Sequence, residues 1–115
     1  MDTTEKFLYL ATIGRISGSP RRIEIWFVSS DGKFYVLAET FHRAQWVMNI
    51  QNNPNVRFSI GGARESQGHE FQGHARVLDQ IRDAGLWQKV QQLSRDKYGW
   101  GDGLPVELCI VNNGR

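Results

Sequence analysis

The sequence contains a single cysteine, no long hydrophobic run and little net charge. The lone Cys109 excludes an internal disulfide and provides no zinc-ligand pattern. No apolar stretch approaches the roughly 18 residues that a membrane span requires, so we expect no membrane segment. The formal net charge of +2 lacks the strong basic excess that is typical of nucleic-acid-binding proteins. Any anion-binding site should therefore be local.

The N-terminal residues, the surroundings of Cys109 and the overall composition predict a globular cytoplasmic protein. Residues 1–6 are polar and acidic and do not resemble a secretory signal, so we expect a cytoplasmic protein. Cys109 lies in the apolar run Val106–Val111, which predicts a buried structural thiol. With 115 residues, 40% of them hydrophobic and 23% charged, the composition is that of a globular protein, and we expect residues 1–115 to form one domain.

Alternating or branched apolar runs predict about six β-strands. Between the second and third runs, Asp31-Gly32 predicts a tight hairpin. In the second run, Ile23, Ile25 and Phe27 should share one face of the strand. The predicted strands are Phe7–Ile13, Ile23–Ser29, Phe34–Ala38, Val56–Ile60, His69–Leu78 and Pro105–Val111.

Two segments have helical periodicity instead. Thr40 is placed to cap a helix over Thr40–Asn53, and Asn53-Pro54 should end it. Asp79 is placed to cap a second helix over Gln80–Lys97. The apolar face of that helix should hold Ile81, Ala84, Trp87, Val90 and Leu93.

The order of these elements predicts the fold class. Gly73 suggests a bulge inside the fifth strand, and Ala63–Gly68 is a polar connection before it. Mostly hairpin-linked strands favour a closed or partly closed barrel, because closure removes exposed strand edges. We therefore predict a mainly β (α+β) fold: an antiparallel barrel of about six strands and two helices, split where the first helix interrupts the strands.

The turn from Gly14 to Arg22 carries an unusual concentration of arginines. Arg15 stands at one end, and Arg21 and Arg22 stand at the other. If the flanking strands pair, these guanidinium groups come together beside serine hydroxyls, a combination that suits a phosphate or carboxylate. The alternative interpretation is a solvent-exposed hairpin tip with solvated charges.

Two motifs resemble a known family. They are Gly14-Arg15-x-Ser17-Gly18-x-Pro20-Arg21 with the strand after it, and Trp46-x-x-Asn49-Ile50-x-x-Asn53-Pro54-x-Val56. Together they resemble the deazaflavin-dependent nitroreductases, which belong to the pyridoxamine-phosphate-oxidase-like, flavin-binding split barrels. The resemblance covers residues 7 to 111. It implies a split β-barrel, a homodimer with two cofactor sites at its interface, and F420 or FMN as the cofactor. It also implies hydride transfer to a small acceptor such as a quinone, a nitroaromatic compound or an enone.

The resemblance also implies which residues bind the cofactor. Arg15, Ser17 and Arg21 match the turn that holds its phosphate or acidic tail. Ala38 and Thr40 match the end of the third strand, beside the ribityl phosphate. The basic pair before the helix and the first residue of the helix motif complete the set: His42, Arg43 and Trp46. Ile16 stands where many deazaflavin-binding members carry a lysine, so F420 and FMN both stay open.

The chemistry of the residues agrees with such a site. Arg15, Arg21 and Arg43 suit a flavin phosphate, and a helix that begins near His42 would direct its positive end at that anion. The flat isoalloxazine ring suits Trp26 or Trp100 as a cover. Tyr98, in a glycine-rich loop, is the candidate proton donor, and a surface-packed aromatic is the alternative.

Two other functions stay open at this stage. One is a cofactor-binding carrier or sensor without turnover. The other is an oligonucleotide-binding module that stacks bases on Trp26 and Phe27 beside the arginines, against which the low net charge argues. His69 and His74 face opposite sides of an unbroken strand, which argues against a shared metal. We expect no nucleic-acid partner, and a homodimer formed through an apolar outer face that includes Trp26 or Val28.

Overall fold

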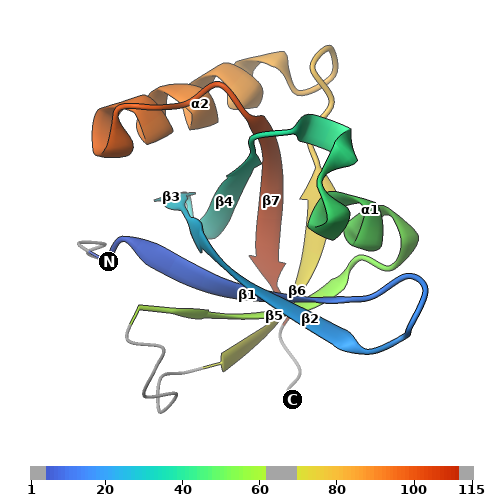
Figure 1. Cartoon of the computed structure of the whole chain (residues 1–115). Coiled ribbons are helices and arrows are strands. Elements are labelled where there is room, and N and C mark those ends of the chain that lie inside the picture. The colour runs from blue at the N-terminus through green and yellow to red at the C-terminus, as the bar shows by residue number, and fades with distance from the viewer. Residues whose placement is uncertain (1–4, 62–69, 112–115) are drawn as a thin grey trace.

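A computed structural model describes residues 5–61 and 70–111 of the chain. In these residues a seven-stranded antiparallel sheet is accompanied by two α-helices and a short 3-10 helix (Figure 1). The mainly β split-barrel prediction is confirmed. The strands are β1 (Phe7–Ile13), β2 (Pro20–Trp26), β3 (Val28–Ser30), β4 (Lys33–Ala38), β5 (Asn55–Ile60), β6 (Glu70–Val77) and β7 (Leu104–Ile110); the helices are η1 (Phe41–Arg43), α1 (Gln45–Asn52) and α2 (Ala84–Tyr98).

The sheet curls until its two ends meet through Phe27. Its strand order is β2-β1-β5-β6-β7-β4-β3. The first and last strands of this order, β2 and β3, are consecutive in the chain, and only Phe27 lies between them. The Phe27 side chain is 1% exposed. Among the described strands β2 pairs with β1 alone. The barrel is therefore open along a seam between β2 and β4.

The joint at Phe27 corrects the predicted second strand. We expected one strand over Ile23–Ser29, but β2 begins at Pro20 and ends at Trp26, and β3 follows separately. This division raises the strand number from six to seven. It also places Arg21 and Arg22 inside β2, where neighbouring side chains point to opposite faces. Arg21 lies opposite the buried Thr12, and Arg22 lies opposite Ala11.

The hairpin between β3 and β4 confirms the prediction from Asp31-Gly32. Asp31 has φ 53° and Gly32 has φ 79°. Positive φ at both central residues is the type I′ geometry, whose twist matches that of the paired strands. The sequence signal is strong here because asparagine, aspartate and glycine adopt this conformation at least cost.

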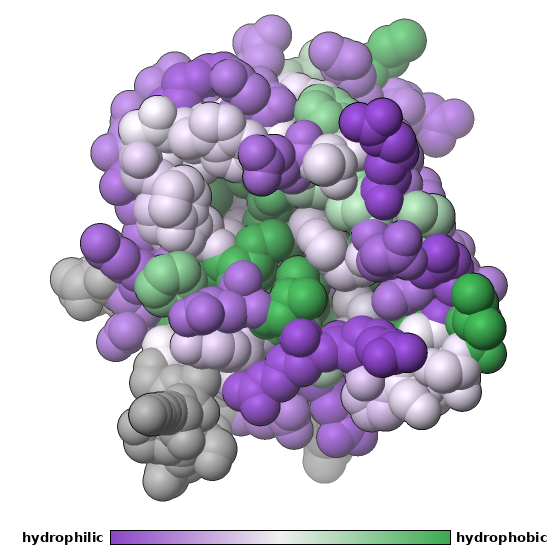
Figure 2. Space-filling view, in the orientation of Figure 1, coloured by the Kyte–Doolittle hydropathy of each residue, from purple (hydrophilic) through white to green (hydrophobic). Residues whose placement is uncertain are grey.

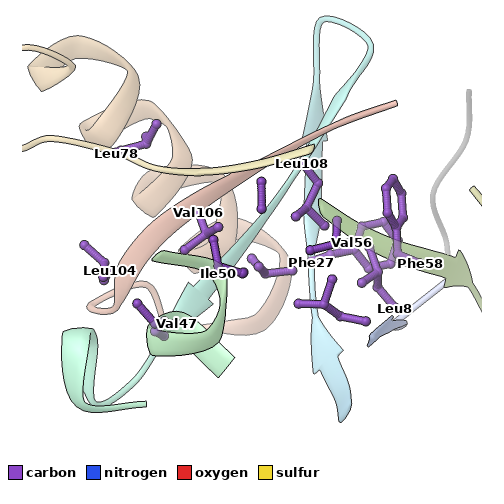
Figure 3. Packing of buried hydrophobic residues seen from close by; sticks show 14 of the residues in the cluster. Leu8, Phe27, Val47, Ile50, Val56, Phe58, Leu78, Leu104, Val106 and Leu108 are labelled. Atoms are coloured by element: carbon purple, nitrogen blue, oxygen red, sulfur yellow. The ribbon is translucent and has the colours of Figure 1, made fainter. Parts of the chain in front are cut away.

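The core fills the barrel and extends under α1 (Figure 3). Leu8, Phe58, Val106 and Leu108 point into it from the sheet, and Val47 and Ile50 enter it from α1, as Figure 3 shows. Helix α1 therefore closes the side of the barrel beside the seam. Its end agrees with the prediction: the last helical residue is Asn52, and Asn53 before Pro54 is extended.

The start of α1 differs from the prediction. Thr40 makes no side-chain capping hydrogen bond, and Phe41 adopts a φ of 54°. A bulky residue with positive φ interrupts helical geometry, so the chain forms only the 3-10 turn η1 before α1 begins at Gln45. The α-helix therefore begins three residues after His42, and the positive end of its dipole lies at Gln45 rather than at His42.

Helix α2 covers the outer face of β3 and β4 with Val90, against Val28, Tyr35 and Leu37. Asp79 caps the turn before the helix, where its carboxylate accepts the backbone N–H groups of Ile81 and Arg82. Helix α2 begins at Ala84, later than predicted. Two residues of the predicted apolar face, Ile81 and Ala84, are therefore not buried against the sheet. Ile81 is 86% exposed, and Ala84 is exposed as well.

Gly73 forms no bulge. The register of β6 with both β5 and β7 is unbroken through it. A Cβ at this position would lie 2.8 Å from the ring of Phe58 and 2.9 Å from the carbonyl oxygen of Cys109. Glycine is therefore needed for space rather than for an irregular backbone. The predicted connection Ala63–Gly68, and His69 at the predicted start of this strand, lie outside the described residues.

A buried carboxylate joins the strands under α2. Glu107 is 5% exposed and accepts hydrogen bonds from the Tyr35 hydroxyl at 3.0 Å and from Arg76 at 3.3 Å. Burial, together with Glu107, raises the pKa of Tyr35. Cys109 is half-buried beside the same carboxylate rather than fully buried, and burial raises the pKa of its thiol. Glu107 therefore has a structural role, because its carboxylate links side chains of three neighbouring strands.

The contacts of Asp83 should make the folding stability of the protein depend on pH in the acidic range. Its carboxylate accepts the Asp79 N–H at 2.8 Å and pairs with Arg76 at 3.0 Å. The backbone hydrogen bond first, and Arg76 next, hold the pKa of Asp83 below its usual value of 3.8. A lowered folded-state pKa stabilises the fold above the unfolded pKa, and this stabilisation is lost as the pH falls through the folded pKa. We expect Asp83→Asn to lose less stability than wild type between about pH 6 and about pH 3 in urea unfolding. Equal losses would contradict this assignment.

Candidate functional site

Two adjacent cavities lie along the seam of the barrel. The first, which we call the tryptophan pocket, has a volume of about 750 Å³ and is lined by Phe7, Ile23, Glu24, Ile25, Trp26, Leu37, Glu39, Thr40, Ala44, Trp46 and Trp100. The second, the arginine pocket, has a volume of about 340 Å³ and is lined by Gly14, Arg15, Ile16, Ser17, Arg21, Ile23, Gln45, Trp46 and Asn49. They share Ile23 and Trp46, and we call the two together the groove. Figure 2 shows a hollow on this face, with hydrophobic residues inside it and hydrophilic residues around it.

Asn49 attaches the turn after β1 to helix α1. Its side-chain oxygen accepts hydrogen bonds from the backbone N–H of Arg15 at 3.1 Å and from Arg15 Nη1 at 2.9 Å. Its amide nitrogen donates to the buried Thr12 hydroxyl at 3.1 Å. Gln45 accepts a further hydrogen bond from Arg15 Nη2 at 2.9 Å. The guanidinium group of Arg15 is thus held in place by neutral oxygens.

No acidic side chain among the described residues neutralises the positive charge of the arginine pocket. Neither Arg15 nor Arg21 forms an ion pair with an acidic side chain of residues 5–61 and 70–111. A Cβ on Gly14 would lie 3.4 Å from Arg21 Nε, so Arg21 packs closely over the start of the turn. Two guanidinium groups that have no acidic partner in this part of the chain have the chemistry that binding of a phosphate or carboxylate requires.

Trp26 forms a rigid wall of the tryptophan pocket. Its ring stacks on that of Tyr98 with centroids 4.4 Å apart and an angle of 3°. The Tyr98 hydroxyl accepts the Phe27 N–H at 3.1 Å and lies 2.8 Å from the Phe27 carbonyl oxygen and 2.7 Å from that of Lys6, to either of which it can donate. The end of α2 therefore fixes Trp26 through the joint between β2 and β3.

The loop after α2 carries Trp100 into the same pocket. Gly99 ends the helix with a left-handed φ of 82°. The Ser94 hydroxyl donates to the Trp100 carbonyl oxygen at 2.5 Å, and the Gln91 side chain donates to the Gly103 carbonyl oxygen at 2.9 Å. These two hydrogen bonds anchor the loop on α2 and position Trp100 opposite the strands of the seam.

A comparison with protein families identifies the family of the chain. A model of the F420H(2)-dependent quinone reductase family matches residues 2–110, which is nearly the whole chain. The chain belongs to this family. It is therefore related to oxidoreductases that use F420, in line with the resemblance that its two motifs carry. None of the curated proteins that were compared matches the chain.

Solved structures show the same fold as this F420H(2)-dependent quinone reductase family member. HutZ, the heme storage protein of Vibrio cholerae, is 22% identical, covers 96% of this chain and 84% of its own, and has a TM-score of 0.76. A FAD-binding protein of Mesorhizobium loti is 15% identical, with coverages of 96% and 84% and a TM-score of 0.71. An F420-H2 dependent reductase, FDR-A, is 19% identical, with coverages of 94% and 97% and a TM-score of 0.64. At these identities the likeness shows the split barrel alone.

The structure brings together five of the residues that the sequence predicted for cofactor binding in this family. Arg15, Ser17 and Arg21 line the arginine pocket, Thr40 lines the tryptophan pocket, and Trp46 lines both. Trp26 and Trp100, the two predicted ring covers, also line the tryptophan pocket.

Other predicted residues lie elsewhere. Ala38 is buried in the core and lines neither pocket. His42 and Arg43 are exposed on η1 and line neither pocket as well. Arg22 lines a separate cavity with Arg57 and Glu70, because it points to the opposite face of β2 from Arg21. Of the three arginines at the turn, Arg15 and Arg21 therefore line the same pocket and Arg22 does not.

Three expectations about aromatic and apolar residues need correction. Tyr98 is the last residue of α2 rather than part of a loop, and its hydroxyl is engaged with the backbone. Phe27 is buried in the core and provides no stacking surface for nucleic-acid bases. Val28 is buried under α2, so it contributes nothing to an exposed dimer face.

Four polar or charged residues that line the two pockets were absent from the predicted set. Asn49 belongs to the helix motif, and its amide at a position facing the barrel was the signal for a buried polar contact. Gln45 carried no signal of its own. Glu24 lies on β2 and Glu39 directly follows β4, and only the closure of the barrel brings these two positions to the same pocket.

Two general features follow from the described part of the chain. No group of three or more histidine, cysteine, aspartate or glutamate side chains within it is arranged to hold a metal ion; His69 lies outside it. None of its helices has both the length and the hydrophobicity that crossing a bilayer requires.

Proposed function

We propose that this chain binds F420 in the groove and reduces a quinone. The anionic tail of the cofactor binds in the arginine pocket, and its ring system lies against the tryptophans. The observation that carries this proposal is a pair of arginines with no acidic partner in residues 5–61 and 70–111, next to a pocket lined by three tryptophans. The chain that holds them is a member of the F420H(2)-dependent quinone reductase family.

The residues of the groove fit such a cofactor. A guanidinium group binds phosphate and carboxylate oxygens with paired, charge-assisted hydrogen bonds, and both kinds of oxygen occur in the tail of F420. Planar indole side chains suit a flat heteroaromatic ring. The two cavities, about 750 and 340 Å³, are in the range of sites that enclose cofactor-sized molecules.

The protein's part in the reaction is binding, orientation and exclusion of water. F420, when bound in its reduced form, supplies a hydride. Asn49 and Gln45 hold Arg15 in a fixed geometry before any ligand arrives, so little side-chain freedom is lost on binding. Trp26, Trp46 and Trp100 surround the pocket with apolar surface, which orients a planar acceptor and limits access of water.

Binding and turnover test this proposal separately. Purified protein is titrated with F420 and, independently, with FMN, with tryptophan fluorescence as the readout. We expect saturable binding of F420, and reoxidation of reduced F420 on addition of menadione. Binding of FMN alone would overturn the choice of cofactor, and binding of neither by folded protein would overturn the proposal.

A carrier or sensor without turnover is the second candidate. The observation that favours it is the fold of HutZ, a heme storage protein, which shows the same barrel in a protein named for storage. This alternative predicts tight F420 binding with no oxidation of reduced F420 over minutes in the presence of quinone.

Tyr98 variants distinguish support of Trp26 from proton donation. We expect Tyr98→Phe to keep the stack on Trp26 and to lose about 1 kcal/mol of stability through the missing hydroxyl. Tyr98→Leu should also weaken F420 binding by about 2- to 10-fold, because it removes an aromatic pair. The measurements are urea unfolding, F420 titration and kcat. A loss of kcat in Tyr98→Phe with F420 affinity unchanged would instead support the role of proton donor, which stays a prediction.

The homodimer that the family resemblance implies also stays a prediction. Trp26, which is 39% exposed, is one of several large apolar residues that the described part of the chain exposes to such an interface. Sedimentation at micromolar concentration should give the mass of a dimer, and a monomeric mass would contradict it.

A further inference from the structure

A buried pair of polar side chains lies behind the arginine pocket. Thr12 on β1 is 0% exposed, and Asn49 on α1 is 4% exposed. The Asn49 amide nitrogen donates to the Thr12 hydroxyl oxygen at 3.1 Å. Apolar side chains of the same shape can replace a buried hydrogen-bonded pair with little loss of stability, or even with a gain. Stability alone therefore does not explain the pair, and its other contacts indicate its role.

The contacts of the Asn49 amide with the turn fix its orientation. Its oxygen accepts two hydrogen bonds from Arg15, one from the backbone N–H at 3.1 Å and one from Nη1 at 2.9 Å. An amide turned by 180° would present its own N–H groups to these two donors. With the oxygen toward Arg15, the nitrogen points toward Thr12. Thr12 therefore holds one end of the amide while the other end holds Arg15.

Thr12 is placed beside both arginines of the pocket. It contacts Asn49, which binds Arg15, and in the β1–β2 pair it lies directly opposite Arg21. Side chains of directly opposite residues in an antiparallel pair point to the same face, with their Cβ atoms roughly 4.5–5.5 Å apart. One buried hydroxyl group therefore lies next to the base of one arginine and supports the residue that holds the other.

The residue that holds Arg15 carries no charge. Asn49 binds the guanidinium group through an amide oxygen, whereas Arg76, on β6, pairs with the carboxylates of Glu107 and Asp83. A carboxylate at position 49 could accept the same two hydrogen bonds, but it would also neutralise the positive charge of Arg15. An amide fixes the guanidinium group in place and leaves its charge available to a ligand.

We propose that Asn49, supported by Thr12, is the positioning residue of the arginine pocket: it orders Arg15 for an anionic ligand and leaves the guanidinium charge unpaired. This inference rests on the proposed function, in which that ligand is the tail of F420. Asn49 acts through Arg15, because a side chain that is already ordered loses less freedom when it binds. The affinity of the groove for the cofactor thus depends on a pair of buried side chains behind it.

Asn49→Asp separates charge from position. The carboxylate keeps an acceptor for Arg15 but neutralises the guanidinium group and cannot donate to Thr12. We expect the Kd for oxidised F420 to rise about 10-fold or more, whereas Asn49→Ala, which leaves Arg15 charged but no longer held, should raise it about 3- to 10-fold. Fluorescence titration gives Kd, and urea unfolding verifies that each variant is folded. A Kd for Asn49→Asp within about 2-fold of wild type would overturn the inference.

Variants of Thr12 test the support of the amide with less disturbance. Thr12→Val keeps the shape of the side chain and leaves the Asn49 amide nitrogen without its partner, and Thr12→Ser keeps the hydroxyl group. We expect Thr12→Val to raise the Kd for F420 about 2- to 5-fold and Thr12→Ser to restore most of the affinity. A loss of stability in Thr12→Val with an unchanged Kd would overturn the role of Thr12 in positioning.

Tyr35→Phe is the matched control for the loss of a buried hydrogen bond. The buried Tyr35 hydroxyl donates to Glu107 at 3.0 Å, and Tyr35 lines neither pocket. This variant should lose stability, as Thr12→Val does, and keep its F420 affinity within about 2-fold of wild type. A loss of affinity equal to that of Thr12→Val would show that Kd reports a general loosening of the fold, which would overturn the inference.

A double-mutant cycle shows whether Asn49 acts through Arg15. Asn49→Ala is introduced into wild type and into Arg15→Ala, and the Kd for F420 is measured in all four proteins. Once the guanidinium group is absent, Asn49 has no side chain left to position, so we expect a further change of less than about 2-fold in the Arg15→Ala background. Equal fold-changes in the two backgrounds would overturn the positioning role.

A second anion distinguishes this inference from the proposed function. Inorganic pyrophosphate is titrated while NMR follows the Nε–H signal of Arg15, which is identified by its absence in Arg15→Ala. We expect a saturable shift in wild type and binding about 5-fold weaker in Asn49→Asp. If wild type binds pyrophosphate in this way but does not bind F420, the proposed function fails and the positioning role stands. No response to either anion would overturn both.

Discussion

Arg15→Ala is expected to weaken F420 binding by about 1–3 kcal/mol, or roughly 5- to 150-fold in Kd, with little effect on folding. Arg15 lines the arginine pocket, and its guanidinium group has no acidic partner among the described residues. Its removal takes away a positive charge and the side-chain hydrogen bonds to Asn49 and Gln45, but no ion pair. The turn itself should persist, because the backbone N–H of residue 15 still donates to Asn49. Fluorescence titration measures the affinity, and urea unfolding verifies the fold.

Two further variants show whether the loss of affinity comes from the position and the shape of the Arg15 side chain. Arg22→Ala is the matched control, because Arg22 belongs to the same strand and turn but faces another cavity; F420 affinity should change by less than about 2-fold. Arg15→Lys keeps the charge and loses the planar fork, so it should recover only part of the affinity. Equal losses in Arg15→Ala and Arg22→Ala would show that general surface charge, rather than the arginine pocket, attracts the cofactor.

Gly101→Ala is expected to destabilise the fold by about 1–3 kcal/mol or more. Gly101 is buried in the loop that carries Trp100. A Cβ there would collide with the backbone carbonyl oxygen of Gln91 in α2 and lie 2.9 Å from Cγ of Arg95. A helix backbone cannot yield as a flexible side chain can, so the loop must move away from α2. Tryptophan emission should change with the displacement of Trp100.

Gly85→Ala is the opposite case and serves as the control. Gly85 is exposed in α2, and a Cβ there would meet nothing within 4 Å. Alanine in a helix is favoured over glycine by about 0.8–1 kcal/mol, so this variant should be more stable than wild type. Urea unfolding of both variants measures the difference. A Gly101→Ala variant as stable as wild type would contradict the close packing of the loop on α2.

Local patterns in the sequence predicted most of the elements correctly. The alternation in Phe7–Ile13 gives β1 with the same bounds, and Asp31-Gly32 gives the expected turn. Asn53-Pro54 ends α1 as predicted. Each of these features depends on neighbours in the chain, because the steric preferences of aspartate, glycine and proline act over one or two residues. Such signals need no knowledge of the tertiary fold.

Predictions failed where a distant contact decides local geometry. Phe27 ends β2 because it is drawn into the core where the sheet closes, and nothing in its neighbours marks that joint. Gly73 was read as a bulge, but it makes room for the ring of Phe58 from the neighbouring strand. Thr40 had the composition of a helix cap, yet Phe41 adopts a positive φ there and delays the helix. For Phe27 and Gly73, tertiary packing overrides the local preference.

The sequence by itself determined most of the strands, the antiparallel barrel and a turn that carries Arg15 and Arg21, because these follow from periodicity and from the chemistry of side chains close together in the chain. Only the tertiary structure decided that Arg21 faces the groove and Arg22 does not, since the start of β2 sets which side chains point inward. It alone also placed Glu24 and Glu39 beside three tryptophans. Those residues come from β2, the end of β4, α1 and the loop after α2, and segments so far apart in the chain meet only when the barrel closes.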